Sequence, residues 1–161
     1  MAGGYTLSLP EEDRHIYTKS YLEKQLTMML GGHVAEELVF GEMSTGPSDD
    51  IDKLTRTTRA MVTRYGMSEE LGTRTFGQKE ELVFLGREIS ERRDYSEKIA
   101  AEIDEAVRRI IDKAHERARN LISENLPKLH QLAQKLLEVE TLEGTALLTL
   151  MAGPSEAAAV S

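Results

Sequence analysis

An aspartate in the middle of the chain occupies an unusual place on a predicted helix. In the helix that begins near Ser48, Asp50 lies about 70° from the centre of the apolar stripe, whereas Asp49 and Asp52 point largely away from it. A carboxylate in this place either complements the positive end of the helix or donates an oxygen to a metal ion at the rim of a helical bundle. The residues alone leave both interpretations open.

The preceding helix carries a second unusual feature, the pair His33 and Glu37. Both fall inside the apolar stripe formed by Leu22, Leu26 and Leu30, one helical turn apart. A glutamate in such a place needs a partner or a raised pKa. Either His33 and Glu37 pair with each other, or Glu37 orients a group from another segment, such as a metal-bound histidine.

The sequence does not contain a complete catalytic set. A catalytic zinc needs about three protein ligands, and a His-Glu-x-x-His helix is the usual source of two of them. None of the four histidines stands in that arrangement: His15, His33, His115 and His130. The sequence has no cysteine nucleophile, no glycine-rich phosphate loop and no serine elbow. We therefore predict no catalytic residue in this chain.

Composition excludes several classes of protein. The 161 residues fit one domain, and 40% hydrophobic with 30% charged residues is typical of a folded protein with a hydrated helical surface. The formal net charge of −8 argues against nucleic-acid binding, because no basic excess is present to neutralise phosphates. The absence of cysteine excludes a disulfide scaffold and a thiolate zinc site. No apolar run reaches the ~20 residues that span a bilayer, so we expect a soluble, intracellular-type domain.

The predicted elements are helices, with one exception. Tyr5, Leu7 and Leu9 alternate with polar residues before Pro10, which predicts a short N-terminal β-strand. That strand either closes a small sheet or offers an edge to an extended peptide. Helical spacing of apolar residues predicts five helices: Thr18 to Gly41, Ser48 to Gly66, one from Asp94 with Glu97 in a capping box, one from Pro127, and a short one from Thr141 to about Met151.

Three segments depart from these patterns. Gly31-Gly32 lies inside the first helix at a cost of about 1 kcal/mol per glycine, which indicates close approach of another backbone. Between Gly66 and about Arg93 the helical pattern lapses, so we expect a functional or mobile loop. Residues 152–161 are small and featureless, and we expect a disordered tail. The predicted fold is an all-α helical bundle of about five helices with one short N-terminal β-strand.

A series of ordered motifs resembles the peptidase domain of the FtsH family, over about residues 3–151. The motifs are Gly3-Gly4-Tyr5-Thr6, Leu9-Pro10-Glu11-Glu12-Asp13-Arg14, Thr18-Lys19-Ser20, Gly31-Gly32, Ala35-Glu36-Glu37-Leu38-Val39-Phe40-Gly41, Ser44-Thr45-Gly46-Pro47-Ser48-Asp49-Asp50-Ile51, Met61-Val62-Thr63, Tyr65-Gly66-Met67-Ser68-Glu69, Phe84-Leu85-Gly86-Arg87-Glu88 and Asp94-Tyr95-Ser96. The resemblance implies that the chain is the C-terminal part of a zinc peptidase domain.

FtsH-family proteins are membrane-anchored, ATP-dependent zinc metalloproteases that form hexameric rings and cut unfolded polypeptides inside them. The resemblance implies that Asp50 matches the third zinc ligand. It also implies that Glu36 and Glu37 match the acidic pair beside the zinc, with Glu37 the better candidate to orient a ligand. The strand Gly4 to Leu7, with Tyr5 and Thr6 between them, resembles the edge strand that aligns the substrate.

The sequence departs from the family pattern in several places. The His-Glu-x-x-His helix that precedes the Gly-Gly-Tyr strand is absent from this sequence, as are the ATPase module and the membrane anchor. His33 stands where arginine is common, and Asp49 where asparagine is frequent. We therefore expect the chain to be inactive alone and to act in a full-length protein, with zinc and ATP, at the cytoplasmic face of a membrane. The alternative is a non-catalytic oligomerisation module of a ring-forming AAA protein.

Overall fold

A computed structural model describes residues 16–77 and 94–152. Six helices follow one another in these ranges: α1 (Lys19–Met29), α2 (Gly31–Phe40), α3 (Ser48–Thr63), α4 (Glu97–Glu124), α5 (Leu126–Val139) and α6 (Gly144–Ala152). No strand forms among the described residues, so the predicted all-α class is confirmed. The predicted N-terminal β-strand, residues 78–93 of the predicted loop and residues 153–161 of the predicted tail lie outside the described residues.

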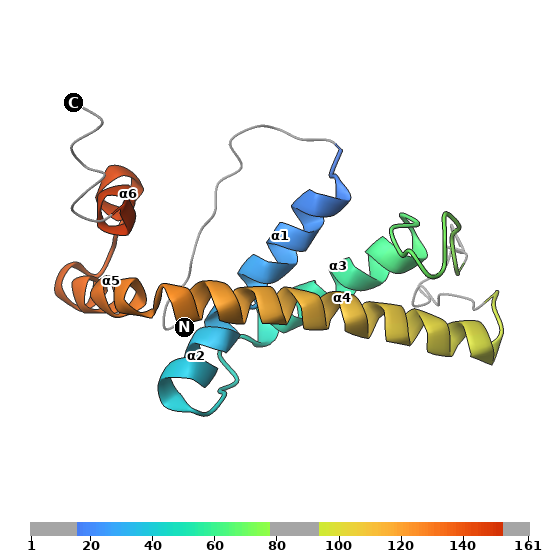
Figure 1. Cartoon of the computed structure of the whole chain (residues 1–161), viewed down its shortest axis with the longest axis horizontal. Helices are drawn as coiled ribbons and strands as arrows, with labels where there is room; N and C mark the ends of the chain where they lie inside the picture. Colours follow the sequence, from blue (N-terminus) through green and yellow to red (C-terminus); the bar gives the residue numbers. More distant parts are fainter. Residues whose placement is uncertain (1–15, 78–93, 153–161) are drawn as a thin grey trace, which may run out of the picture.

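The long helix α4 organises the molecule. Figure 1 shows α4 passing in front of the chain formed by α1, α2 and α3, and all three helices contact it. Beyond the end of α4, α5 continues and α6 packs against α5. Within residues 16–77 and 94–152, no helix combines the length and the apolar character needed to cross a membrane.

The main core lies where α1, α2 and α3 meet the middle of α4. Leu26, Val34 and Met61 are fully buried, one from each of the three helices. They belong to a cluster that includes Ala114 and Ala118 of α4. Because alanine side chains are small, α4 can lie close to the three helices that cross it. The apolar stripes predicted from the sequence therefore converge on one face of α4.

A second core cluster lies near the start of α4 and includes the segment that follows α3. Val62, Phe76 and Ile103 are buried together there. The Phe76 backbone N–H donates to the Thr63 carbonyl oxygen at 2.8 Å, which returns the chain to the end of α3. Gly66 allows this return, because it has a φ of 59° and a Cβ would meet the Thr73 Cα at 3.1 Å.

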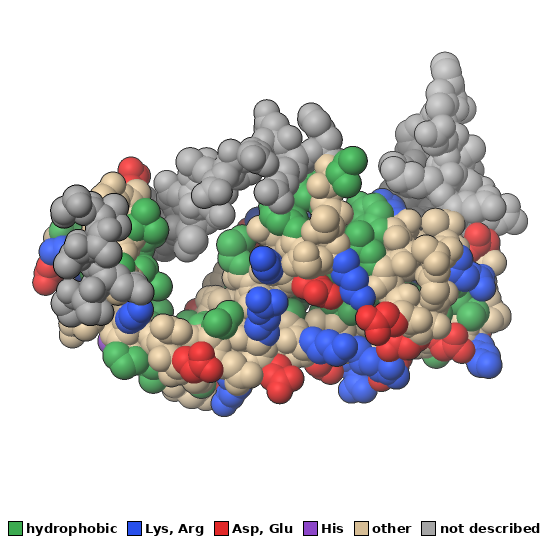
Figure 2. All heavy atoms as spheres, turned by 45° about the horizontal axis from the view of Figure 1, so that its top comes forward, with side chains coloured by type: hydrophobic (Ala, Val, Ile, Leu, Met, Phe, Trp, Pro, Cys, Tyr) green, Lys and Arg blue, Asp and Glu red, His purple; other side chains and the backbone are tan. Residues whose placement is uncertain are grey.

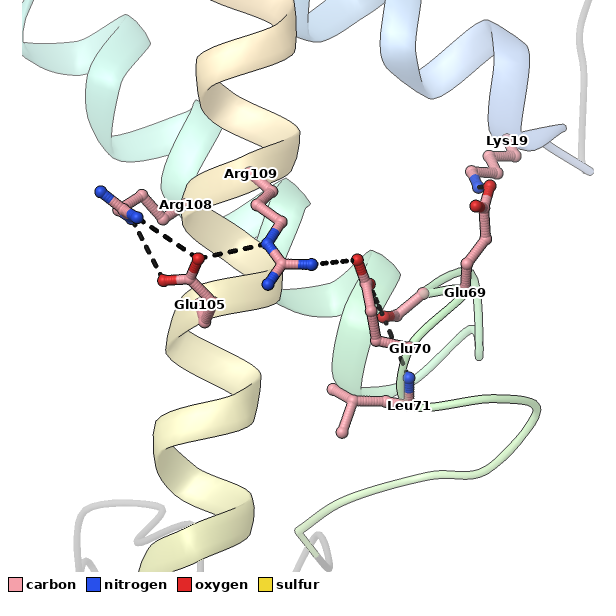
Figure 3. A network of polar contacts seen from close by, with 8 residues as sticks. Lys19, Glu69, Glu70, Leu71, Glu105, Arg108 and Arg109 are labelled. Atoms are coloured by element: carbon pink, nitrogen blue, oxygen red, sulfur yellow. Dashed lines mark hydrogen bonds and ion pairs between the residues drawn. The ribbon is translucent and has the colours of Figure 1, made fainter.

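Charged side chains of α1 and α4 form ion pairs with the segment that follows α3 (Figure 3). Arg109 of α4 donates to Glu70 at 2.6 Å and to Glu105 at 3.1 Å. Lys19 at the start of α1 donates to Glu69 at 3.1 Å. These solvent-exposed ion pairs contribute modestly to stability, and they connect residue 69 to α1 and residue 70 to α4.

The predicted helix from Thr18 to Gly41 is two helices, so the prediction of one continuous helix was wrong. α1 ends and α2 begins at Leu30, although the predicted ends are correct. The Thr18 side chain accepts from the Tyr21 N–H at 3.2 Å, and Gly41 ends α2 with a φ of 72°. Apart from the neighbouring residues and the nearby backbone of α2 itself, no described atom lies within 4 Å of a Cβ built on either glycine of the Gly31-Gly32 pair. The close backbone approach predicted there is therefore not found in the described part of the chain.

Several predicted helix ends differ from those observed. Pro47, not Ser48, is the N-cap residue of α3. Ser96, not Asp94, caps α4, because its hydroxyl accepts from the Ile99 N–H at 3.4 Å. Asp94 instead accepts from the Gly77 N–H at 2.8 Å, a contact between segments that spacing along one helix does not reveal.

Candidate functional site

Asp50 lies in the first turn of α3 with its carboxylate open to solvent. Its side chain is 52% exposed, and its ion-pair partner, Lys53, lies 4.0 Å away from Oδ1 to Nζ. The helical wheel placed Asp50 beside the apolar stripe, which predicted a more buried side chain. The Asp50 side chain is more exposed than that, and residues 41–46, which lead into α3, are exposed as well. An exposed pair at this distance contributes ~0–1 kcal/mol, so the carboxylate oxygens remain available to a ligand.

Glu36 shapes the turn that leads to Asp50. Its Oε2 accepts from the Ser44 backbone N–H and its Oε1 accepts from the Ser44 hydroxyl, both at 3.0 Å. The Ser44 Oγ in turn accepts from the Gly46 N–H at 3.1 Å. The Pro47 carbonyl oxygen then accepts from the Asp50 N–H at 3.1 Å, which starts α3. Both Glu36 oxygens therefore have hydrogen-bond partners. The Glu36 side chain holds the turn that precedes Asp50.

Glu37, the next residue, binds α4. Its Oε1 accepts from Arg119 Nη1 at 2.6 Å, and its Oε2 lies 3.5 Å from His115 Nε2. The Arg119 hydrogen bond holds the pKa of Glu37 below its ordinary value of 4.5, although desolvation opposes the shift. The sequence left open a pairing with His33, but the partners that the structure shows come from α4.

His33 lies one turn before Glu37 on α2 and also approaches α4. The His33 and His115 rings meet edge to face, with centroids 6.2 Å apart and planes at 70°. We call His33, Glu37, His115 and Arg119 the α2–α4 polar cluster. Across residues 16–77 and 94–152, no group of three or more histidine, aspartate or glutamate side chains could hold a metal ion. The α2–α4 polar cluster therefore joins two helices and is not a complete metal site.

Two members of this cluster were missed from the sequence, although a signal was present. His115 and Arg119 are four residues apart on α4. They directly follow Ala114 and Ala118, which are buried in the core. Polar residues at that spacing beside a buried stripe lie at the edge of a helix contact. The pattern could have identified the face of α4, but not the residue of α2 that meets it.

In the structure, the three predicted acidic residues therefore lie in two separate places. Glu36 and Asp50 belong to the turn and helix start between α2 and α3, whereas Glu37 belongs to the α2–α4 polar cluster. In the part of the chain that the structure describes, no hydrogen bond or ion pair joins Asp50 to either glutamate. The predicted substrate strand, Gly4 to Leu7, lies outside the described residues.

Comparisons with known proteins agree with the resemblance seen in the sequence. Residues 1–150 match the model of Peptidase family M41. The ATP-dependent zinc metalloprotease FtsH 1 of Sphaerobacter thermophilus is 53% identical over 154 residues, which cover 96% of this chain and 24% of that protein. FtsH 1 of Thermomicrobium roseum is 54% identical over 144 residues, covering 89% and 22%. FtsH of Chloroflexus aggregans is 52% identical over 149 residues, covering 91% and 23%.

The chain thus spans about a quarter of the length of these curated relatives. The family match covers nearly the whole chain, including both segments that carry the candidate acidic residues. The predicted resemblance to FtsH proteases is confirmed at the level of the family. The chain belongs to peptidase family M41.

Proposed function

We propose that this chain is part of a zinc-dependent peptidase domain that cuts unfolded polypeptides, and that Asp50 donates one zinc ligand. The observation that carries the proposal is the difference between three acidic side chains. Glu36 and Glu37 are held by short hydrogen bonds, whereas Asp50 makes only the 4.0 Å contact with Lys53 among the described residues. Asp50 is therefore the one of the three whose oxygens can bind a metal without losing a hydrogen bond to another described residue.

The donor chemistry of Asp50 fits zinc, which accepts carboxylate oxygen beside imidazole nitrogen. Zinc, when bound, polarises a scissile carbonyl and lowers the pKa of a bound water. The two imidazole ligands would come from a His-Glu-x-x-His helix outside this sequence. Glu36 acts as a positioning residue, because its bonds to Ser44 hold the turn from which Asp50 emerges.

The substrate and the setting follow from the same family relationship. The strand Gly4 to Leu7 would hold an extended polypeptide beside the zinc through backbone hydrogen bonds. The curated relatives are named as ATP-dependent zinc metalloproteases. In a protein of their length, ATP-driven unfolding would deliver the polypeptide, within a hexameric ring held to a membrane by segments outside this sequence.

A chimera tests the zinc role of Asp50. This chain replaces the matching segment of the Sphaerobacter relative, to which it is 53% identical. We expect Asp50→Asn to lose stoichiometric zinc, measured by atomic absorption, and to lose casein hydrolysis. Asp52→Asn is the matched control, because Asp52 is exposed on the same helix and lies about 200° away around its axis. An Asp50→Asn chimera that keeps both zinc and hydrolysis would contradict the proposal.

The alternative function, a non-catalytic oligomerisation module, is favoured by a different observation. No residue of α5 or α6 is buried, although both helices are rich in leucine. The same chimera distinguishes the two functions. If Asp50→Asn abolishes hydrolysis while the assembly stays intact, the zinc role holds, whereas unchanged hydrolysis leaves assembly as the main role.

A further inference from the structure

Two histidines of the α2–α4 polar cluster bring imidazole rings together from distant parts of the chain. The His33 ring of α2 and the His115 ring of α4 have centroids 6.2 Å apart. Their neighbours along the chain, Val34 and Ala114, are buried in the same core cluster. Because that core is closely packed, it fixes the points from which the two rings project.

Both rings are accessible and free to turn. The His115 side chain is 34% exposed, and His33 is half-buried. Neither ring makes a hydrogen bond with another described residue, so rotation about the side-chain torsions breaks none within residues 16–77 and 94–152. An ion can therefore reach the two rings from solvent, and each ring can turn a nitrogen toward it.

The separation of the rings suits one shared metal ion. A metal ion lies about 2 Å from the nitrogen of a bound imidazole and therefore roughly 3.2 Å from the centre of that ring. Two rings on opposite sides of one ion thus have centres at most roughly 6.4 Å apart. The 6.2 Å between His33 and His115 is within this limit, so one ion can bind both after the rings turn.

A carboxylate beside one ring adds to the site. Glu37 Oε2 lies 3.5 Å from His115 Nε2, while Arg119 holds the other oxygen, Oε1, at 2.6 Å. A carboxylate in such a place commonly orients a metal-binding histidine by accepting from its second ring nitrogen. The described residues contain no group of three such side chains that could hold the ion, so water would complete its coordination.

Few other histidines compete for such an ion. The chain has four histidines and no cysteine, and histidine forms almost none of the face drawn in Figure 2. Imidazole nitrogen suits copper, nickel and zinc, and copper(II) forms the most stable complexes of the three. We propose that His33 and His115 together bind one divalent transition-metal ion, and that this ion links α2 to α4.

Copper(II) binding to the 161-residue chain tests the shared site. In isothermal titration with copper(II) chloride, His33→Asn and His115→Asn should each weaken the tightest site by about tenfold or more, because losing one of two ligands costs at least as much affinity as losing an outer partner. The double variant should bind no more weakly than either single variant, since the two rings act as one site. His130→Asn is the matched control, because His130 is exposed on α5 and lies outside the α2–α4 polar cluster. Circular dichroism verifies that each variant keeps its helices.

Two further measurements show where the ion binds. Electron paramagnetic resonance of the bound copper should report two imidazole nitrogens in the natural chain and one in each single variant. Copper should also raise the melting temperature of the natural chain, but not of the double variant, because the folded chain alone holds the two rings together. Affinity that either histidine variant leaves unchanged, a single nitrogen in the natural chain, or an unchanged melting temperature overturns the proposal. Copper affinity that falls in Asp50→Asn would place the ion at the candidate zinc ligand and would overturn it equally.

Discussion

Arg119 of α4 donates a 2.6 Å hydrogen bond to Glu37 of α2, and this contact joins residues that are 82 positions apart in the chain. α2 has one buried residue, Val34, so its apolar contact with the core is small. The polar contact beside Val34 therefore adds to the attachment of α2 to α4. Since Glu36 on the same helix holds the turn before Asp50, the position of α2 also affects the candidate metal ligand.

Replacing Arg119 with alanine should loosen α2. We expect the melting temperature to fall by about 2–4 °C, the shift that follows from losing one partly exposed, charge-assisted hydrogen bond in a chain of this size. Arg117→Ala is the matched control, because Arg117 lies on the same helix without an ion-pair partner among the described residues. Thermal unfolding followed by circular dichroism at low protein concentration measures both variants. Equal melting temperatures for the two would contradict the role of Arg119.

The Glu37 contact should also make stability depend on pH. Arg119 lowers the pKa of Glu37 in the folded state below the ordinary 4.5, so the folded state binds this proton more weakly than the unfolded state does. The stability from this group is therefore present above pH 4.5 and is lost as the pH falls through the lower, folded pKa. Urea unfolding of the natural chain and of Glu37→Gln should give a stability difference at neutral pH that shrinks under acid conditions. A difference that persists in acid would show that Glu37 acts through packing instead.

Met61 tests the main core. Its side chain is fully buried between α3 and its neighbours, so Met61→Ala leaves a cavity and should lower the free energy of unfolding by about 2–5 kcal/mol. Met28→Ala makes the same chemical change at a residue that is 49% exposed, and it should cost far less. Urea denaturation compares the two. Similar losses would mean that the core is not centred where α3 meets α4.

Ser96 and Ser48 give opposite expectations for the same substitution. Ser96→Ala removes the side chain that accepts from the Ile99 N–H and should cost about 1 kcal/mol, as is typical for an N-cap. Ser48→Ala should cost little, because Ser48 lies inside α3 and Pro47 is the N-cap residue. Chemical denaturation of both variants measures the difference. A larger loss for Ser48→Ala would show that Ser48, and not Pro47, caps α3.

The chain by itself should hydrolyse no casein and bind zinc weakly. Asp50 supplies one ligand of about three that a catalytic zinc requires, and the described residues contain no group of three that could hold the ion. Isothermal titration with zinc and a fluorescent casein assay measure both properties, and Asp50→Asn should change neither in this setting. Tight, stoichiometric zinc together with hydrolysis would show that the chain holds a complete site.

Most of the helical structure could be predicted from the sequence because it depends on neighbours along the chain. The apolar stripes of α3 and α4 repeat at the helical period, and Thr18 and Gly41 mark helix ends by local chemistry. The break at Leu30 could not be predicted in the same way. The apolar pattern runs through Leu30 without interruption, and only the packing shows that α1 contacts both α3 and α4 while α2 contacts α4.

The same distinction between local spacing and tertiary contact applies to the candidate site. Asp50 could be singled out from the sequence, because a helical wheel and a family motif both depend on spacing alone, and its metal role remains a prediction. The partner of Glu37 could not be identified, since Arg119 comes from a helix far along the chain and only the packing of α2 on α4 brings the two together. Local spacing thus determined which segments are helical and which acidic residues are notable. Tertiary structure decided which of those residues already have partners, because hydrogen bonds and ion pairs act over a few ångströms and depend on where distant segments meet.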